Sequence, residues 1–97
     1  MNRFDQTKLI LKARKLQKEL QKTIIEVEAG GGAVKVEISG EQKLQRIRID
    51  PDQIKLEDIG QLERWLEEAI KEAINKSQQL AAEKMKPMMG ALGNLGL

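Results

Sequence analysis

The stretch from residue 33 to residue 51, AVKVEISGEQKLQRIRIDP, constrains the fold of this chain more than any other part of the sequence. Val34, Val36 and Ile38 alternate with polar residues, and a period of two is typical of a strand with one face buried and the other exposed. Residues 44–49 form a second extended run after a short polar link. The two runs predict an antiparallel hairpin around which the other elements pack.

The turn and the far end of this hairpin have signals of their own. Gly40 is expected to take a positive φ in the turn. The alternation of the second run is imperfect, because Leu44 is out of phase with Ile47, and this predicts a bulge near Gln45-Arg46. Pro51 cannot donate a hydrogen bond to a neighbouring strand, so we expect the sheet to end there.

A further strand is expected before the hairpin. Residues 23–29 are rich in β-branched side chains, and Ile25, Val27 and Ala29 alternate with glutamates, which is the pattern of a half-buried strand. Residues 30–32 are three glycines without the lysine and serine or threonine of a phosphate-binding loop, so a flexible hairpin loop is expected. The sequence therefore predicts a three-stranded antiparallel sheet.

A first helix is predicted over residues 5–22, before the sheet. Asp5 is a candidate N-cap. Apolar residues recur at helical spacing and form one narrow face, which consists of Leu9, Ala13, Leu16 and Leu20. The opposite side carries lysines and an arginine, with Leu11 near the middle of this cationic arc. An exposed leucine in such a place indicates a helix–helix or subunit contact more than a ligand site.

A second, longer helix is predicted to begin after Asp58, which stands at capping-box spacing from Gln61. One apolar face continues to about Met85, and a helix over residues 58–85 would be about 42 Å long. A compact domain of this size has a radius of gyration of about 13 Å, so the helix must project as an arm or lie against a second subunit. Pro87 is expected to stop it, which gives a single domain over residues 1–87 and a flexible, Gly-rich tail over residues 88–97.

Charge is unevenly distributed along the chain, although the net charge is only +2. Residues 3–22 contain seven Lys or Arg and two acidic residues, a local balance of +5, whereas residues 57–72 have a balance of −4. A polyanion should therefore meet the first helix and avoid the start of the second. The alternative interpretation is a solvated face, because lysine and arginine are good helix formers that usually lie in water.

Several function classes lack the residues they need. The chain has no His, Cys or Tyr, which removes the usual general bases, most transition-metal ligands and two nucleophiles. Paired carboxylates occur four residues apart on the second helix, where a solvated face is the expected role. We therefore expect no enzyme, no cofactor, no metal and no small-molecule substrate. No membrane span or signal peptide is recognisable, and the absence of Cys is compatible with the cytoplasm.

The apolar core is thin for a stable monomer. Only one Phe and one Trp occur in 97 residues, and a domain of this length has little margin of stability unless it associates. Trp65 lies at the border of the long helix's apolar stripe, where a core or interface role is favoured over base stacking. The candidate residues for a dimer interface are Leu11, Leu62, Trp65, Leu66 and Ile70.

The order and spacing of these features resemble one known family. The residues that carry the resemblance are Gly32, Val34, Val36, Gly40, Ile47, Ile49, Asp50, Pro51, Leu62, Ala69, Glu72, Ala73 and the run AAEKM at 81–85. On them the chain resembles the YbaB/EbfC family of bacterial nucleoid-associated proteins over most of its length. It departs from the family at Lys71, where Asn is common, and has a shorter N-terminus.

The resemblance implies an α+β fold, with a helix, three antiparallel strands and a long helix, assembled as a tweezer-like homodimer. It also implies that the protein binds double-stranded DNA with little sequence selectivity and contributes to nucleoid organisation and gene regulation. The alternative is a dimeric protein-interaction adaptor that binds nucleic acid incidentally.

Two sets of cations are candidates for the DNA contact. The first set is the cationic side of the first helix and comprises Lys8, Lys12, Arg14, Lys15, Lys18 and Lys22. The second set lies near the far end of the long helix and comprises Lys76, Lys84 and Lys86. Neither set resembles a cluster suited to reading base edges, so contacts to phosphates are expected.

Overall fold

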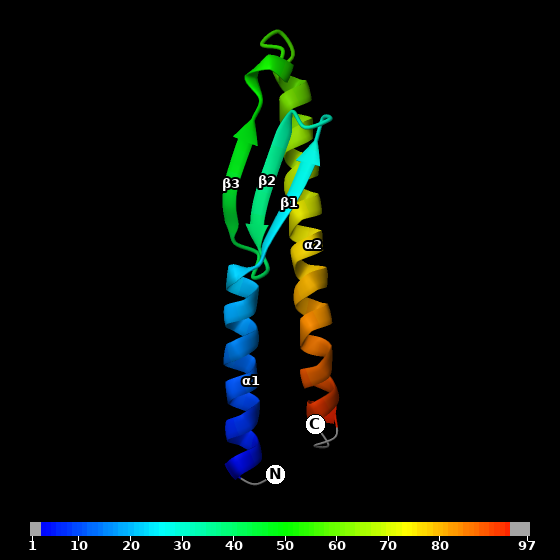
Figure 1. Ribbon diagram of the computed structural model, residues 1–97. Helices are drawn as coiled ribbons and strands as arrows, with labels where there is room; N and C mark the ends of the chain where they lie inside the picture. Colours follow the sequence, from blue (N-terminus) through cyan, green and yellow to red (C-terminus); the bar gives the residue numbers. More distant parts are fainter. Residues whose placement is uncertain (1–2, 94–97) are drawn as a thin grey trace.

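A computed structural model describes the backbone of residues 3–93 and the side chains of residues 6–88. Helix α1 (Arg3–Lys22) leads directly into strands β1 (Ile24–Ala29), β2 (Val34–Ser39) and β3 (Leu44–Ile49). A short 3-10 helix, η1 (Pro51–Gln53), connects the sheet to helix α2 (Ile59–Gly93). The predicted α+β order of helix, three antiparallel strands and long helix is confirmed (Figure 1).

The molecule is elongated. The sheet covers the upper half of α2, and α1 runs beside the lower half, so that both ends of the described chain lie at the same pole (Figure 1). The Cα radius of gyration is 18.7 Å and the principal extents are 65 × 21 × 15 Å. A compact chain of this length would have a radius of gyration of about 13 Å. The two helices therefore form a pair of arms below the sheet.

The core lies between the sheet and α2. The strand order is β1-β2-β3, with Val27 opposite Val36 and Val36 opposite Ile47. The predicted apolar face of β2 is confirmed, because Val34 and Val36 are 0% exposed. From α2, Ala69 and Ala73 complete the core as small residues that let the helix approach the sheet closely.

Strand β3 is the exposed edge of this arrangement. The register places Ile47 and Ile49 on the same face of the sheet as the buried valines of β2. Their side chains nevertheless remain 39% and 43% exposed, and Leu44 is 53% exposed. Helix α2 packs on β1 and β2, so the inner face of β3 is left without a cover from the described part of its own chain.

The turn between β2 and β3 joins the sheet to both helices. The predicted bulge is confirmed, because the register shifts between Glu37 and Ile38 and leaves Gln45 as the extra residue. The expected positive φ at Gly40 is wrong: Gln42 has that conformation, with φ 62°. Gly40 is needed for another reason, since a Cβ there would lie 2.9 Å from the carbonyl oxygen of Leu20 in α1.

A buried serine fixes this turn to α2. The Ser77 hydroxyl donates to the carbonyl of Ser39 at 2.6 Å and accepts from the backbone N–H of Gln42 at 3.1 Å. On the other side of the turn, the Gly40 N–H donates to the Leu20 carbonyl at 2.9 Å, which satisfies one of the free carbonyls at the end of α1. The turn thus sets the position of α1 relative to α2.

Two helix boundaries differ from those predicted. Helix α1 begins at Arg3, so Asp5 lies inside its first turns and is not the N-cap. Helix α2 begins as expected after Asp58, whose carboxylate accepts from the Gln61 N–H at 3.2 Å. The predicted stop at Pro87 is wrong, because α2 continues through Pro87 to Gly93.

The continuation of α2 has a physical reason. Proline inside a helix removes one hydrogen bond, here to the carbonyl of Glu83, and its ring crowds that carbonyl, so it kinks or breaks many helices. Pro87 and Glu83 are both exposed, so water can replace the lost partner. Residues 88–93 of the predicted tail are therefore helical, and residues 94–97 lie outside the described residues.

Candidate nucleic-acid interface

Helix α1 presents a cationic surface to solvent. On its apolar face, Leu20 is buried and Leu9 and Leu16 are half-buried. The predicted DNA-binding residues on its other sides, Lys8, Lys12, Arg14, Lys15, Lys18 and Lys22, are all exposed. Among the described residues, the last five of these form no ion pair within 4 Å. Within the described part of the chain, these five charges are therefore left without a directly bound carboxylate.

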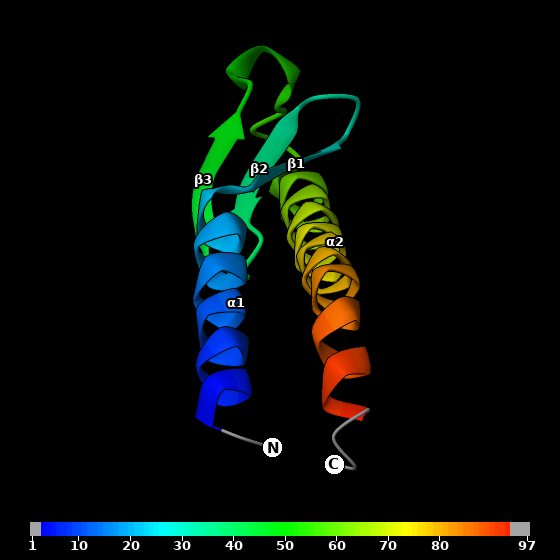
Figure 2. The same cartoon turned by 60° about the horizontal axis from the view of Figure 1, so that its bottom comes forward.

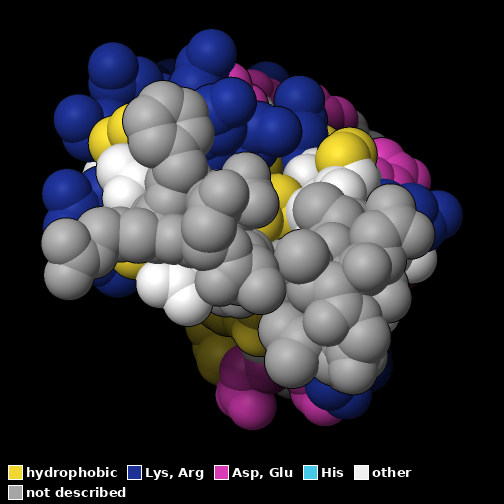
Figure 3. All heavy atoms as spheres, turned by 90° about the horizontal axis from the view of Figure 1, so that it is seen from below, with side chains coloured by type: hydrophobic (Ala, Val, Ile, Leu, Met, Phe, Trp, Pro, Cys, Tyr) yellow, Lys and Arg dark blue, Asp and Glu magenta, His cyan; other side chains and the backbone are white. Residues whose placement is uncertain are grey.

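A groove between the two arms brings cations from both helices together. It is lined by Lys12, Lys15, Leu16 and Glu19 of α1 and by Lys84 and Met88 of α2. A second, apolar hollow between the arms shares Leu16 and Met88 with this groove and is also lined by Ala13, Gln17, Leu20 and Met85. Seen from the lower pole, Lys and Arg side chains gather around α1 and reach the gap between the arms (Figure 3). The turned ribbon in Figure 2 shows the two arms side by side.

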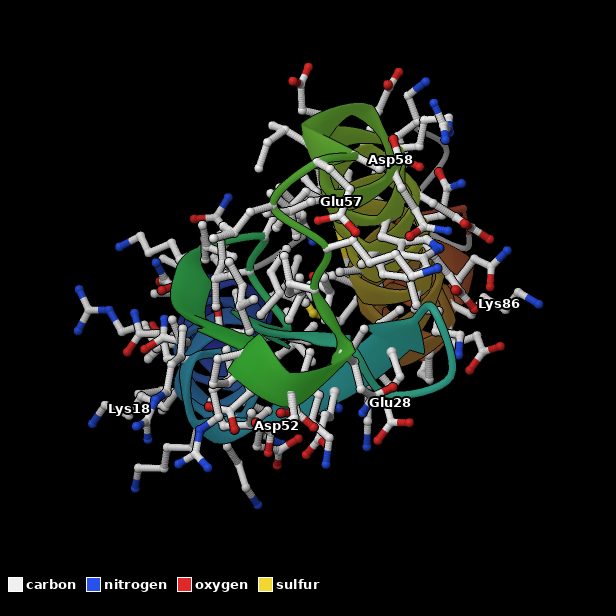
Figure 4. The ribbon with its side chains drawn as sticks, turned by 90° about the horizontal axis from the view of Figure 1, so that it is seen from above. Lys18, Glu28, Asp52, Glu57, Asp58 and Lys86 are labelled. Carbon is white, nitrogen blue, oxygen red and sulfur yellow. The ribbon has the colours of Figure 1, made fainter. Side chains whose placement is uncertain are left out.

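The three cations predicted as a second set are separated by the structure. Lys84 joins the groove. Lys76 is bound by Glu72 at 3.2 Å in an i,i+4 pair. Lys86 projects from α2 on the side away from Lys18 of α1 (Figure 4). Only Lys84 of this set therefore shares a surface with the cations of α1.

One lysine in the acidic part of α2 is paired with a neighbouring carboxylate. Lys71 lies 2.8 Å from the Glu67 carboxylate, and the hydrogen bond and charge of this lysine lower the pKa of Glu67. Both side chains are exposed, so this pair adds little to stability. The stretch remains acidic overall, with the predicted balance of −4 over residues 57–72.

The apolar residues predicted for a dimer interface have a role within the monomer. Leu62, Trp65, Leu66 and Ile70 are half-buried and pack against the core of their own chain. Leu11 is 58% exposed on α1. Their participation in an interface stays a prediction.

Sequence reasoning missed the part of the apolar hollow that Met88 forms, because the predicted helix ended before this residue. Met85 and Met88 stand three residues apart and extend the same helical stripe as Ala81. That spacing was the available signal, and Pro87 obscured it. With the helix continued, the two methionines face α1 across this hollow.

A family model described as the YbaB/EbfC DNA-binding family matches residues 5–92. The chain belongs to this family. Nearly all of the described structure lies within the match, including both arms, the groove between them and the sheet. Membership of a DNA-binding family makes DNA the partner of this chain, and it confirms the resemblance inferred from the sequence.

Individual relatives of this YbaB/EbfC protein agree with the match. A nucleoid-associated protein of Chloroflexus aurantiacus is 43% identical over 82 residues, covering 84% of this chain and 82% of the relative. A nucleoid-associated protein of Koribacter versatilis is 36% identical, covering 84% of this chain and 80% of the relative. The crystal structure of an uncharacterized protein from Helicobacter pylori has a TM-score of 0.78 at 22% identity and covers 86% of this chain and 87% of that one.

Neither a membrane span nor a metal site accompanies the cationic surface of α1 in the described residues of this YbaB/EbfC chain. In the described part, no helix is long and apolar enough to cross a membrane. No group of three or more acidic residues there is arranged to hold a metal ion. The DNA contact of the exposed cations on α1 stays a prediction.

Proposed function

We propose that this protein binds double-stranded DNA as a nucleoid-associated protein and contributes to nucleoid organisation and gene regulation. The observation that supports this most is the exposed cationic surface of α1, where Lys12, Arg14, Lys15, Lys18 and Lys22 form no ion pair within 4 Å with a described residue, and which Lys84 extends across the groove. A surface with many exposed lysines attracts the phosphate backbone of a duplex. The names of the relatives point to the same role.

Binding should depend little on DNA sequence. The α1 surface consists of lysines with a single arginine among the candidates, Arg14. Lysine acts on phosphates as a point charge, whereas base edges are read by forked groups such as Arg, Asn and Gln. Phosphate contacts position a protein on the duplex without carrying sequence information.

We further infer that the working unit is a homodimer with its arms arranged like tweezers. Three observations support this: the exposed inner face of β3, the elongated shape of the single chain and the small core. A two-fold axis would present two α1 surfaces to one duplex. Two or three phosphate contacts from each would give a slope of about −4 to −5 in a plot of log affinity against log salt.

A salt titration of DNA binding tests the proposal. Random-sequence duplex, single-stranded DNA and RNA would be compared by mobility shift at two or more ionic strengths. We expect duplexes of unrelated sequence to bind alike, with a salt slope at least as steep as the −4 to −5 that the α1 contacts contribute. Affinity that is unaffected by salt, or confined to one sequence, would contradict phosphate-based binding.

A charge reversal on α1 identifies the surface. Lys12→Glu combined with Lys15→Glu should weaken all duplexes alike and flatten the salt slope, because both residues lie on the rim of the groove. Glu68→Gln on α2 is the control and should leave binding unchanged or slightly tighter, because it removes negative charge. Wild-type affinity and slope in the double variant would move the site away from α1.

A further inference from the structure

The outer face of the sheet contains cations outside the site described above. The strand register places Lys35 opposite Arg48, and Glu37 opposite Arg46. All four alternate with the buried residues of β2 and with Ile47 and Ile49, so they belong to the face that points away from α2. Strand β3 therefore exposes two arginines, Arg46 and Arg48, on the outer face of the sheet.

Two carboxylates near Arg48 are already engaged, whereas Glu37, opposite Arg46, has no ion pair within 4 Å among the described residues. Glu28 of β1 binds Lys35 at 3.3 Å. Asp50 lines the same shallow hollow as Arg48, and its carboxylate accepts from the Asp52 N–H at 3.0 Å and from the Gln53 side chain at 2.8 Å. Those hydrogen bonds lower the pKa of Asp50, with the Gln53 bond as the larger cause.

Arg46 and Arg48 are exposed and form no ion pair within 4 Å with any described residue. For Arg46 this holds even though Glu37 stands opposite on β2. In the sheet, Lys35 and Lys43 have carboxylate partners. The uncompensated cations of the sheet are thus the two arginines of β3.

The arginines continue the cationic side of α1. The turn before β3 is fixed to the end of α1 by the bond from the Gly40 N–H to the Leu20 carbonyl. Arg46 lies two residues, or about 7 Å, beyond the start of β3 at Leu44. In Figure 4, Lys18 of α1 points to the side away from α2. The start of β3 thus lies next to the last turns of α1, because the turn before β3 is bound to Leu20.

We propose that Arg46 and Arg48 form a second set of phosphate contacts, on which a duplex bound along α1 continues over the outer face of β3. This inference rests on the proposed function and extends its site. A guanidinium binds a phosphate with two parallel hydrogen bonds, and alternate residues of a strand present two such groups about 7 Å apart on one face. A second copy that covers the inner face of β3 would leave this outer face open.

A paired substitution tests the charge of this set. With β3 engaged, the wild-type salt slope is steeper than the −4 to −5 expected from α1 alone, because each phosphate contact adds about 0.9. Arg46→Gln combined with Arg48→Gln should return the slope to about that value and weaken binding roughly tenfold or more at 0.1 M salt. Arg46→Lys with Arg48→Lys should keep the slope.

The matched control removes two positive charges elsewhere. Arg64 and Lys71 are exposed cations on α2, and Arg64→Gln with Lys71→Gln should leave the slope unchanged. Circular dichroism would verify that each variant is folded, which we expect because the four side chains are exposed. A wild-type slope in the β3 variant would overturn the inference.

Cross-linking gives an independent readout. The chain has no cysteine, so Lys18→Cys, Arg48→Cys and Lys71→Cys each introduce a unique thiol for a photoreactive probe. We expect adducts with random duplex from positions 18 and 48 and none from position 71. An adduct from position 18 alone overturns the β3 contact and leaves the proposed function intact, whereas no adduct from either position contradicts both.

Discussion

At the scale of single residues, glycines determine how closely the elements approach one another. Gly30, Gly31 and Gly32 all have positive φ, at 64°, 65° and 93°. A Cβ added to Gly30 would lie 2.5 to 2.9 Å from ring atoms of Trp65, whereas one added to Gly31 would meet nothing within 4 Å. The loop that the sequence predicted as flexible is thus part of the packing around the single tryptophan.

This difference gives the first residue-scale prediction. Gly30→Ala should destabilise the fold by about 2 to 4 kcal/mol, because it combines a disfavoured φ with a clash against the indole. Gly31→Ala has the same φ without the clash and should cost about 1 kcal/mol. Urea unfolding followed by the emission of Trp65 measures both. Equal costs for the two variants would show that the indole does not pack on Gly30.

A second residue-scale prediction concerns the long helix. Leu66 is half-buried and packs against the core, so Leu66→Ala should cost about 2 kcal/mol, at the lower end of the range for leucine truncation. DNA binding should fall only as far as folding fails. Normal stability with lost binding would instead make this part of α2 a recognition surface.

At the scale of elements, the sequence predicted the strands better than the helix ends. A period of two in β2 and a bulge in β3 follow from local side-chain order, and both are present. The end of α2 could not be predicted in this way. An interior proline costs a helix a hydrogen bond and a clash with the i−4 carbonyl, and part of that cost is offset when the freed carbonyl can bind water, which depends on the exposure of Glu83 in the folded chain.

The same limit applies to the candidate site. Periodicity identified the cationic side of α1, yet it could not show that Lys84 lies across a groove from Lys12. The distance between two helices depends on their packing, which here is fixed by the Ser77 and Gly40 contacts at the β2–β3 turn. Sequence spacing within one helix contains no such information.

The proline itself gives an element-scale prediction. Pro87 is exposed inside α2, and replacing a proline in a helix interior by alanine favours the helix by up to about 3 kcal/mol. Pro87→Ala should therefore slow hydrogen exchange of the backbone amides in the last turns of α2. Gln79→Ala, at another exposed position of the same helix, is the control and should change exchange little. Faster exchange in Pro87→Ala would contradict the continuous helix.

At the scale of the whole molecule, the chain has an apolar surface that its own elements leave open. Ile47 and Ile49 belong to the inner face of the sheet but lie beyond the reach of α2. The sequence could indicate that these residues are apolar, but it could not show which strand α2 leaves uncovered. Burial of such a face by a second copy is the usual remedy for a small domain with a thin core.

This surface gives the last prediction. The wild-type chain of 11.0 kDa should behave as a dimer in light scattering after gel filtration, with a melting temperature that rises with protein concentration. Ile47→Glu should dissociate the dimer or lower that melting temperature, because a two-fold interface places like charges close together. Leu56→Glu is the matched control, since Leu56 is 83% exposed in the connection before α2, and it should leave both measurements unchanged. A wild-type monomer with a sharp, concentration-independent transition would exclude the dimer and require the exposed face of β3 to be stable in water.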